Sequence, residues 1–207
     1  MEITTIKPAV KNEHRANIFL DGKFSFSLDL TQLADAKLKV GQTLQPDQLI
    51  ELKQLSNFGK LYQRTLEWVL TRPRSVQETK DYLIRKKFQK PEYEITDSAI
   101  TAVLEKLQAK NYLNDVNFTT YYIENRFQKK GISQKRLRQE LLKKGITDNL
   151  INQALAASPR DELTEIKKVI AKKRRLKTYQ DDAKLIQYLL RQGFDFSLVQ
   201  TAVHETD

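Results

Sequence analysis

Apolar and polar residues alternate near the start of the chain, a pattern typical of β-strands with one buried face. Two short apolar-rich runs, 14–20 and 23–28, flank the pair Asp21-Gly22. An Asp-Gly pair between such runs predicts a two-residue hairpin, because a type I′ turn needs positive φ at both central positions. Residues 3–10 are expected to supply a third strand.

The second run has one apolar face, and helical periodicity follows it. Phe24, Phe26 and Leu28 alternate with polar residues, so we expect these three side chains to share one face of the sheet. A short helix is predicted around 30–37. A longer helical pattern begins at Asp47, and the sequence leaves open whether it runs unbroken to residue 70.

An internal repeat occupies the rest of the chain. Residues 82–88, 140–146 and 188–194 all read x-Leu-aliphatic-basic-polar-(Gly/Lys)-apolar without a gap. Eight residues before each central leucine stands a residue that caps helix N-termini well. These predicted caps are Ser75, Ser133 and Asp181. Recurrence of the same elements in the same order indicates a repeat architecture.

Each repeat is predicted to hold three helices. One helical run precedes the motif, over 61–70, 116–129 and 161–177, and another with i, i+3, i+4 apolar spacing follows it. The glycines at 131, 145 and 193 are expected where helices end. A single three-helix unit could hardly bury its apolar face alone, so neighbouring units must stack.

The predicted fold is therefore mainly α. We expect tandem three-helix repeats in an elongated, curved body, preceded by a small N-terminal segment that contains the β-hairpin. The predicted boundaries are 1–57 for that segment and 58–110, 111–158 and 159–207 for the repeats.

Charge separates the two parts. Residues 1–57 hold seven Lys/Arg and seven Asp/Glu, so the whole formal net charge of +10 lies in 58–207. Such an excess indicates a polyanionic partner, although a basic surface also simply keeps a protein in solution.

The chain has no cysteine, which excludes disulfides and thiolate metal sites. With no secretory signal and no apolar run of membrane-spanning length, we expect a soluble cytoplasmic protein without membrane contact.

Catalytic motifs are missing from the sequence. The two histidines, His14 and His204, lie near opposite ends of the chain, and no phosphate-binding glycine loop, dinucleotide fingerprint or nucleophile elbow occurs. We therefore expect no enzyme activity, no cofactor and no metal. Such a protein works by occupying a surface and biasing the conformational cycle of another protein.

The densest basic run lies within 167–177, where seven of the side chains are cationic. On a continuous helix Lys168, Lys172 and Arg175 would share one face and repel each other, and an anionic partner would relieve that repulsion. The alternative is a solvated helix face. The candidate contacts from this run are Lys168, Lys172, Lys173, Arg174 and Arg175.

A second group of cations lies between 126 and 144, opposed only by Glu140. These residues belong to two predicted helices and a turn and cannot all face one way. A structural role therefore stays open beside a contact with phosphate or with an acidic protein. The candidates from this group are Arg126, Lys129, Lys130, Arg136, Lys143 and Lys144.

Two further sets complete the candidates. The arginines at 72 and 74 stand just before a predicted helix start, where their guanidinium groups suit a carboxylate or phosphate as well as a structural ion pair. Residues 85–87 are equivalent to the basic pair 143–144 of the next repeat; such periodic charge suits a helical filament and is also what duplication leaves behind. These candidates are Arg72, Arg74, Arg85, Lys86 and Lys87.

Several stretches, taken together, resemble the RecX family. They are 70–75, 112–126, 130–146 and the closing 189–197, and their order and spacing are specific. RecX proteins consist of tandem three-helix repeats and modulate the recombinase RecA in homologous recombination, DNA repair and the SOS response. Residues 1–57 resemble the extension of longer members from Gram-positive bacteria, and their role stays open.

The resemblance implies binding within the groove of the filament that RecA forms on single-stranded DNA. There the family suppresses ATP hydrolysis, strand exchange and filament growth. RecA is then the primary partner and single-stranded DNA a secondary contact, and we expect the protein to be a monomer.

Two other interpretations stay open. One is a direct, sequence-nonspecific DNA-binding protein whose basic repeats follow the phosphate backbone, with an affinity that falls steeply with salt. The other is a helical scaffold for a different acidic protein. The residues by themselves indicate only a basic helical repeat that binds an extended anionic surface.

Overall fold

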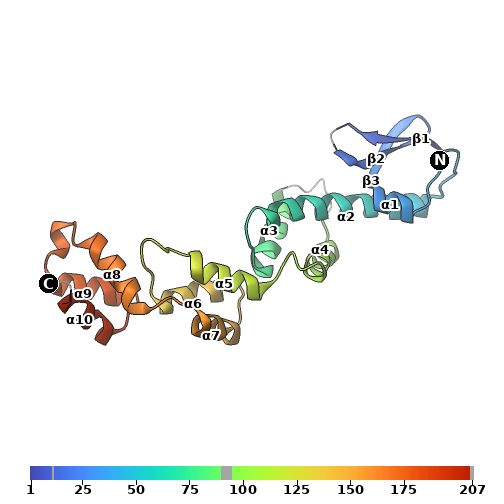
Figure 1. Cartoon of the computed structure of the whole chain (residues 1–207). Helices are drawn as coiled ribbons and strands as arrows, with labels where there is room; N and C mark the ends of the chain where they lie inside the picture. Colours follow the sequence, from blue (N-terminus) through green and yellow to red (C-terminus); the bar gives the residue numbers. More distant parts are fainter. Residues whose placement is uncertain (11, 90–94, 206–207) are drawn as a thin grey trace. The chain divides into compact units, whose positions relative to one another are not determined.

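The computed structural model describes residues 1–10, 12–89 and 95–205 (Figure 1). Two compact bodies divide the chain. The first comprises Met1–Thr71 with Leu83–Ala109, and the second comprises Arg72–Tyr82 with Lys110–Asp207. Each is mainly helical, except that the first also contains a three-stranded sheet.

The sheet is antiparallel, in the order β1 (Ile3–Ala9), β2 (Asn12–Leu20), β3 (Lys23–Asp29). The predicted hairpin is confirmed: Asp21 and Gly22 have φ of 48° and 79°, and Leu20 pairs with Lys23 across the turn. The predicted third strand is confirmed as β1.

Phe24 does not share the buried face of β3, contrary to expectation. Between the pairs Ile18–Phe26 and Phe19–Phe24 the register shifts by one residue at a β-bulge. Because one extra residue reverses the alternation, Phe26 is buried whereas Phe24 is 56% exposed.

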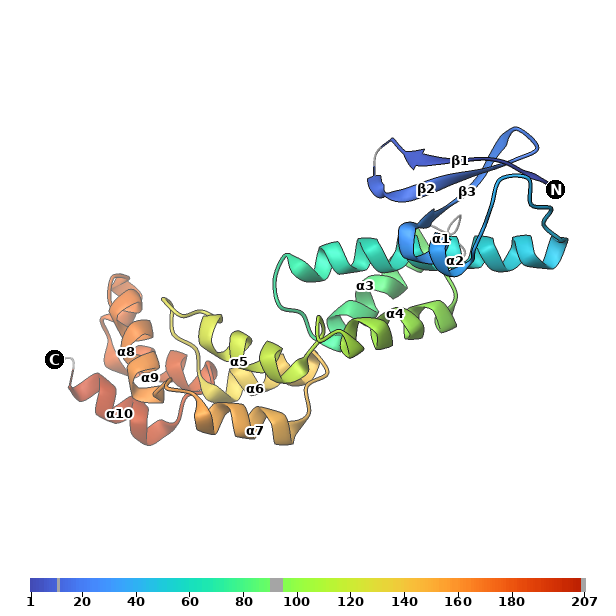
Figure 2. The same ribbon diagram turned by 45° about the vertical axis from the view of Figure 1, so that its right-hand side comes forward.

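The inner face of the sheet packs against two helices, α1 (Leu30–Asp35) and α2 (Pro46–Leu70), and both views show α2 along the sheet (Figures 1 and 2). The apolar core between them includes Ile3, Ile18, Leu20, Phe26, Leu28, Leu44 and Leu52. Helix α2 is continuous through Gly59, so the predicted boundary at 57/58 lies inside it.

The remaining helices follow the predicted repeat. Helices α3 (Val76–Gln89) and α4 (Asp97–Ala109) come next. They are followed by α5 (Asp115–Asn125), α6 (Gln134–Lys143) and α7 (Asp148–Ala157). The last three are α8 (Glu162–Lys173), α9 (Asp182–Arg191) and α10 (Phe196–His204), with a 3₁₀ turn, Lys177–Tyr179, between α8 and α9. Helices α5–α7 enclose one apolar core and α8–α10 another.

All three predicted N-caps are confirmed. Ser75 Oγ accepts the amide of Glu78 at 3.0 Å, Ser133 Oγ accepts that of Arg136 at 3.2 Å, and Asp181 accepts that of Lys184 at 3.3 Å.

Two predicted helix ends are wrong. The helix expected over 116–129 ends at Asn125, because Arg126 adopts an extended conformation with ψ of 116° and Phe127 follows it with a left-handed φ of 49°. The helix expected over 161–177 ends at Lys173. Gly131 therefore lies in a turn beyond α5, whereas Gly145 and Gly193 follow α6 and α9 as predicted.

Within the second body, the start of α3 docks on α5 and α6 through main-chain and capping groups. Ser75 Oγ donates to the carbonyl of Lys144, the residue that caps α6, at 2.8 Å. The amide of Val76 donates to the Asp115 carboxylate at 2.9 Å. Burial raises the pKa of Asp115 in this contact, although the bond from Val76 partly opposes the shift. We call this the first joint.

The start of α6 docks on α8 and α9 through equivalent groups. Ser133 Oγ donates to the carbonyl of Gln192, which caps α9, at 2.6 Å. The amide of Gln134 faces the Glu162 carboxylate, whose pKa is raised chiefly by burial and partly lowered by this amide. This second joint repeats the first, group for group.

Candidate functional site

Several cations of the run 167–177 are held by carboxylates of the protein itself. Lys168 Nζ lies 2.6 Å from Glu165, Lys167 Nζ lies 2.8 Å from Glu205, and Arg174 Nη2 lies 2.5 Å from Asp182. Arg174 also caps α8. For Lys168 and Arg174 the structural interpretation fits better than that of a partner contact.

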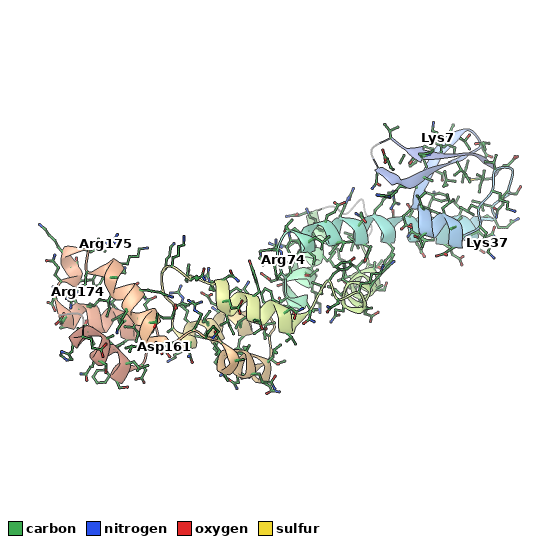
Figure 3. All side chains as sticks on the ribbon, viewed as in Figure 1. Lys7, Lys37, Arg74, Asp161, Arg174 and Arg175 are labelled. Carbon is green, nitrogen blue, oxygen red and sulfur yellow. The ribbon has the colours of Figure 1, made fainter. Side chains whose placement is uncertain are left out.

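Lys172, Lys173 and Arg175 make no ion pair within the described part of the chain. Lys173 Nζ lies over two tyrosine rings, 4.2 Å from the centroid of Tyr188 and 5.0 Å from that of Tyr179. Arg175 is exposed beyond the end of α8 (Figure 3). The helical face expected for Lys168, Lys172 and Arg175 therefore does not form.

A cleft in the second body brings cations from both basic groups together. It has a volume of about 220 Å³. Lys172 and Lys173 of α8 line one part of it, and Lys130 and Arg136 come from the turn before α6 and from α6 itself. The other lining residues are Phe127, Gly131, Ile132, Ser133, Val169, Tyr188, Gln192 and Phe194. None of the described lining residues is acidic. We call this site the basic cleft.

The turn before α6 shapes one wall of the basic cleft. The main-chain oxygen of Phe127 accepts the amides of Lys130 and Gly131 at 2.8 and 3.0 Å. Gly131 has φ of 76°, and a Cβ there would collide with the main-chain oxygen of Glu165. A glycine is required at this point because the turn must pass so close to α8.

A salt-bridge network behind the turn holds the ring of Phe127. Arg126 donates through Nε to Glu140 at 2.7 Å, and its guanidinium stacks 3.8 Å from the centroid of Phe127. Tyr122 donates to the same carboxylate at 2.6 Å. Burial alone would raise the pKa of Glu140, but the bonds from Arg126, Tyr122 and Arg136 outweigh burial and lower it to about 2. Arg126 is therefore a positioning residue and not a free contact.

The guanidinium of Arg136 binds other side chains of the protein and also lines the basic cleft. It lies 3.4 Å from Glu140 and donates at 2.7 Å to the side-chain oxygen of Gln192, another lining residue. Its side chain is nevertheless 44% exposed, so part of the guanidinium is available to a ligand.

The buried carboxylate of Glu165 binds residues next to the cleft, and the sequence pattern does not identify it as a site residue. Only 3% of its surface is exposed. It accepts from Arg160, from Lys168 and, at 3.1 Å, from the amide of Ile132. Burial alone would raise the pKa of Glu165, but the bonds from Arg160 and Lys168 hold it below its ordinary value.

The structure places the other predicted contacts elsewhere. Glu78 lies 3.2 Å from Arg72 and 2.7 Å from Lys144, and Asp97 lies 2.8 Å from Lys87. These three cations therefore serve structural ion pairs. Arg74 and Lys86 are half-buried, whereas Arg85, Lys129 and Lys143 are exposed, and none of these five lines the cleft.

The aromatic lining is the part of the site that sequence reasoning missed. Phe127 follows Arg126 in the sequence, and Tyr188 lies next to Lys173 in the structure. The positions of these two aromatic residues in the sequence, however, resemble those of core residues. A signal was present in the order Arg126-Phe127-x-Lys-Lys, where an aromatic residue interrupts a basic run.

The arrangement suits an anion. Four cations around a cleft without an acidic lining residue raise the local concentration of anions, and partly buried walls strengthen the attraction. Aromatic rings add a stacking surface. Among the described residues no group of His, Asp or Glu is placed to hold a metal ion, and no helix has the length and apolarity to cross a membrane.

Three regions of the chain match family models. Residues 1–45 match the N-terminal domain of regulatory protein RecX, residues 114–155 match the second three-helix domain of RecX, and residues 161–203 match the third. The last two matches cover α5–α7 and α8–α10 almost completely.

Curated relatives extend the match over nearly the whole chain. The regulatory protein RecX of Bacillus licheniformis is 33% identical over 210 residues, which cover 99% of this chain and 77% of the relative. The protein of the same name from Bacillus pumilus is 31% identical over 208 residues, or 98% of this chain and 76% of the relative. A crystal structure of a regulatory protein RecX has the same fold, with a TM-score of 0.72 at 23% identity over 98% of both chains.

Proposed function

Since the chain belongs to the RecX family of regulatory proteins, we propose that it regulates homologous recombination and DNA repair in the cytoplasm by binding the filament of RecA on single-stranded DNA. It suppresses ATP hydrolysis and strand exchange by that filament. RecA is the primary partner, and single-stranded DNA is the secondary contact.

The basic cleft is the observation that supports an anionic contact. Lys130, Arg136, Lys172 and Lys173 converge there from segments far apart in the chain, without an opposing carboxylate among the described lining residues. A phosphate of the DNA or a carboxylate of RecA satisfies this arrangement. The protein then acts by occupying a surface, because binding one state of the filament in preference shifts its conformational cycle.

The RecA activity test uses single-stranded-DNA-dependent ATP hydrolysis, titrated with the full chain. We expect hydrolysis to fall while the protein is well below RecA in concentration, under conditions where it hardly binds naked DNA. Unchanged hydrolysis at equimolar protein would contradict the proposed function.

The role of the basic cleft is tested by a double charge reversal, Lys130→Glu with Lys172→Glu. Both side chains are exposed and neither makes an ion pair in the described structure, so the fold should persist. We expect the concentration for half-inhibition to rise at least about tenfold, since two attractive contacts become repulsive.

The matched control reverses two exposed lysines of the same body that lie outside the cleft, Lys80→Glu with Lys110→Glu. It changes net charge equally and should retain most of the inhibition. Equal loss in both double variants would show a general charge effect and remove the cleft from the mechanism.

The same cleft also supports a second candidate function, direct binding to DNA without regard to sequence. In that case RecA activity would fall only once the protein coats the DNA. The logarithm of the affinity would then decrease by about 0.7 per log unit of salt for each phosphate neutralised on a single strand. Inhibition well below saturation of the DNA excludes simple competition for DNA.

A further inference from the structure

The outer face of the N-terminal sheet carries an aromatic pair, of which Phe24 is exposed and Phe19 is half-buried. The register places Thr5, Lys7, Asn17, Phe19 and Phe24 on the face that turns away from the core. The rings of Phe19 and Phe24 meet edge to face, 5.9 Å apart at 78°. Lys7 Nζ lies 4.6 Å from the centroid of Phe19, and Figure 3 labels Lys7 on this sheet.

The β-bulge of β3 creates this surface. Without the register shift between Phe19 and Ile18, Phe24 would join Phe26 in the core. Instead more than half of Phe24 is exposed to water, 56% of its surface. An exposed phenylalanine lacks the stabilisation that burial would give it. A ligand that covers the ring on this face would provide that stabilisation.

The chemistry of the face matches one class of ligand. The exposed ring of Phe24 offers a surface on which a flat base can stack, with the ring of Phe19 beside it, and every base has a π face. Lys7 supplies a charge for a phosphate, and Thr5 and Asn17 supply hydrogen-bonding groups. The register also places Asp29 on this face, opposite Arg15, but its carboxylate accepts the amide of Gln32 at the start of α1.

We propose that the outer face of the N-terminal sheet binds single-stranded nucleic acid by stacking a base on Phe24, with Phe19 beside it. This site is separate from the basic cleft, which lies in the other body. Residues 1–57 carry no net charge, so stacking contributes more than electrostatic attraction to the binding of nucleic acid at this site.

The first experiment measures binding of the full chain to a fluorescent oligothymidine by anisotropy. Phe24→Ala should weaken binding at least about fivefold, the low end of what one stacked base contributes. Phe24→Tyr should bind like the unchanged protein, because the ring remains. Phe196→Ala is the matched control, since Phe196 is 54% exposed in the other body.

Salt dependence separates this site from the basic cleft. Phe24→Ala should leave the slope of log affinity against log salt unchanged because the ring carries no charge, whereas Lys7→Gln should reduce it by up to about 0.7. The double variant Lys130→Glu with Lys172→Glu should also reduce the slope. Failure of the RecA test would leave these expectations untouched.

A cross-linking measurement locates the contact directly. An oligonucleotide containing 5-iododeoxyuridine should cross-link on irradiation to a peptide that contains Phe19 or Phe24. The proposal is overturned if the oligonucleotide does not bind, if Phe24→Ala binds as well as Phe196→Ala, or if cross-links avoid the sheet. It is equally overturned if Phe24→Ala abolishes self-association in sedimentation while DNA binding persists, because the face then joins two copies of the chain.

Discussion

At the residue scale, Glu165 is a charged side chain that is buried in the second body. It is surrounded by Arg160, Lys168 and the amide of Ile132. Replacing it by glutamine removes the charge but keeps the volume, and leaves Arg160 without its counterion at a site where only 11% of that side chain is exposed. Breaking one side of a buried pair costs about 3–5 kcal/mol.

We therefore predict that Glu165→Gln lowers the free energy of unfolding by about 3–5 kcal/mol, measured by denaturant titration at neutral pH. Asp148→Asn is the control, because its partner Arg138 is bound at the surface, where an ion pair contributes about 0–1 kcal/mol. Equal effects of the two substitutions would mean that Glu165 is not the buried anchor described here.

A second residue-scale prediction concerns acid. In the folded state the pKa of Glu140 is about 2, below its ordinary value near 4.5. A depressed pKa means that the folded state favours the charged form, so the stabilisation is present above pH 4.5 and is lost as the pH falls toward 2. We predict that unchanged protein is more stable than Glu140→Gln at pH 7, and that this difference shrinks progressively between pH 4.5 and 2. Chemical denaturation at several pH values measures it; a constant difference would contradict the prediction.

At the scale of elements, the two joints allow a comparison of equivalent glycines. Gly145 and Gly193 both follow a helix with positive φ, 79° and 86°. A Cβ at 145 would lie 2.6 Å from Gln77 Cβ across the first joint, whereas at 193 the nearest atom would be Ser133 Oγ at 3.2 Å. Both positions carry the backbone penalty of a left-handed residue, and only the first adds a severe clash.

Gly193→Ala should accordingly destabilise the second body by about 1–2 kcal/mol, the ordinary cost of an alanine at positive φ. Gly145→Ala should cost clearly more, with the excess arising from displacement of α3 at the first joint. Thermal unfolding of both variants measures the difference. Equal midpoints would show that Gln77 moves aside without cost.

Elements that rest on local chemistry were predictable from the sequence, and those that rest on contacts between distant segments were not. The Asp21-Gly22 turn and the caps at Ser75 and Ser133 depend on residues within a few positions, and all are confirmed. The bulge that exposes Phe24 and the early end of α5 at Asn125 are tertiary effects, because the periodicity continues through both. The basic cleft belongs to the second kind, since Lys130 and Lys172 meet only after folding.

At the scale of the whole molecule, the sole tryptophan reports on one body. Trp68 lies on α2 in the first body, whereas backbone circular dichroism reports helices of both. Two compact bodies need not unfold in one transition. We predict that Glu165→Gln lowers the denaturant midpoint of part of the dichroism signal and leaves the Trp68 fluorescence midpoint unchanged.

The reciprocal variant is Leu52→Ala, in the core beneath the sheet. Removing this buried side chain costs about 2–5 kcal/mol and should shift the fluorescence midpoint instead. Coincident shifts in both signals for both variants would show that the bodies unfold as one cooperative unit.

The two joints have a consequence for how such a chain can grow. The segment α5–α7 carries an acceptor set, the Asp115 carboxylate and the Lys144 carbonyl, and also a donor set, the Ser133 hydroxyl and the Gln134 amide. Because one set fits the other, a tandem copy of this segment would bind its original without a new contact having to evolve. Lengthening the protein by whole segments is therefore a single genetic event, in which duplication supplies the module together with the means of attaching it.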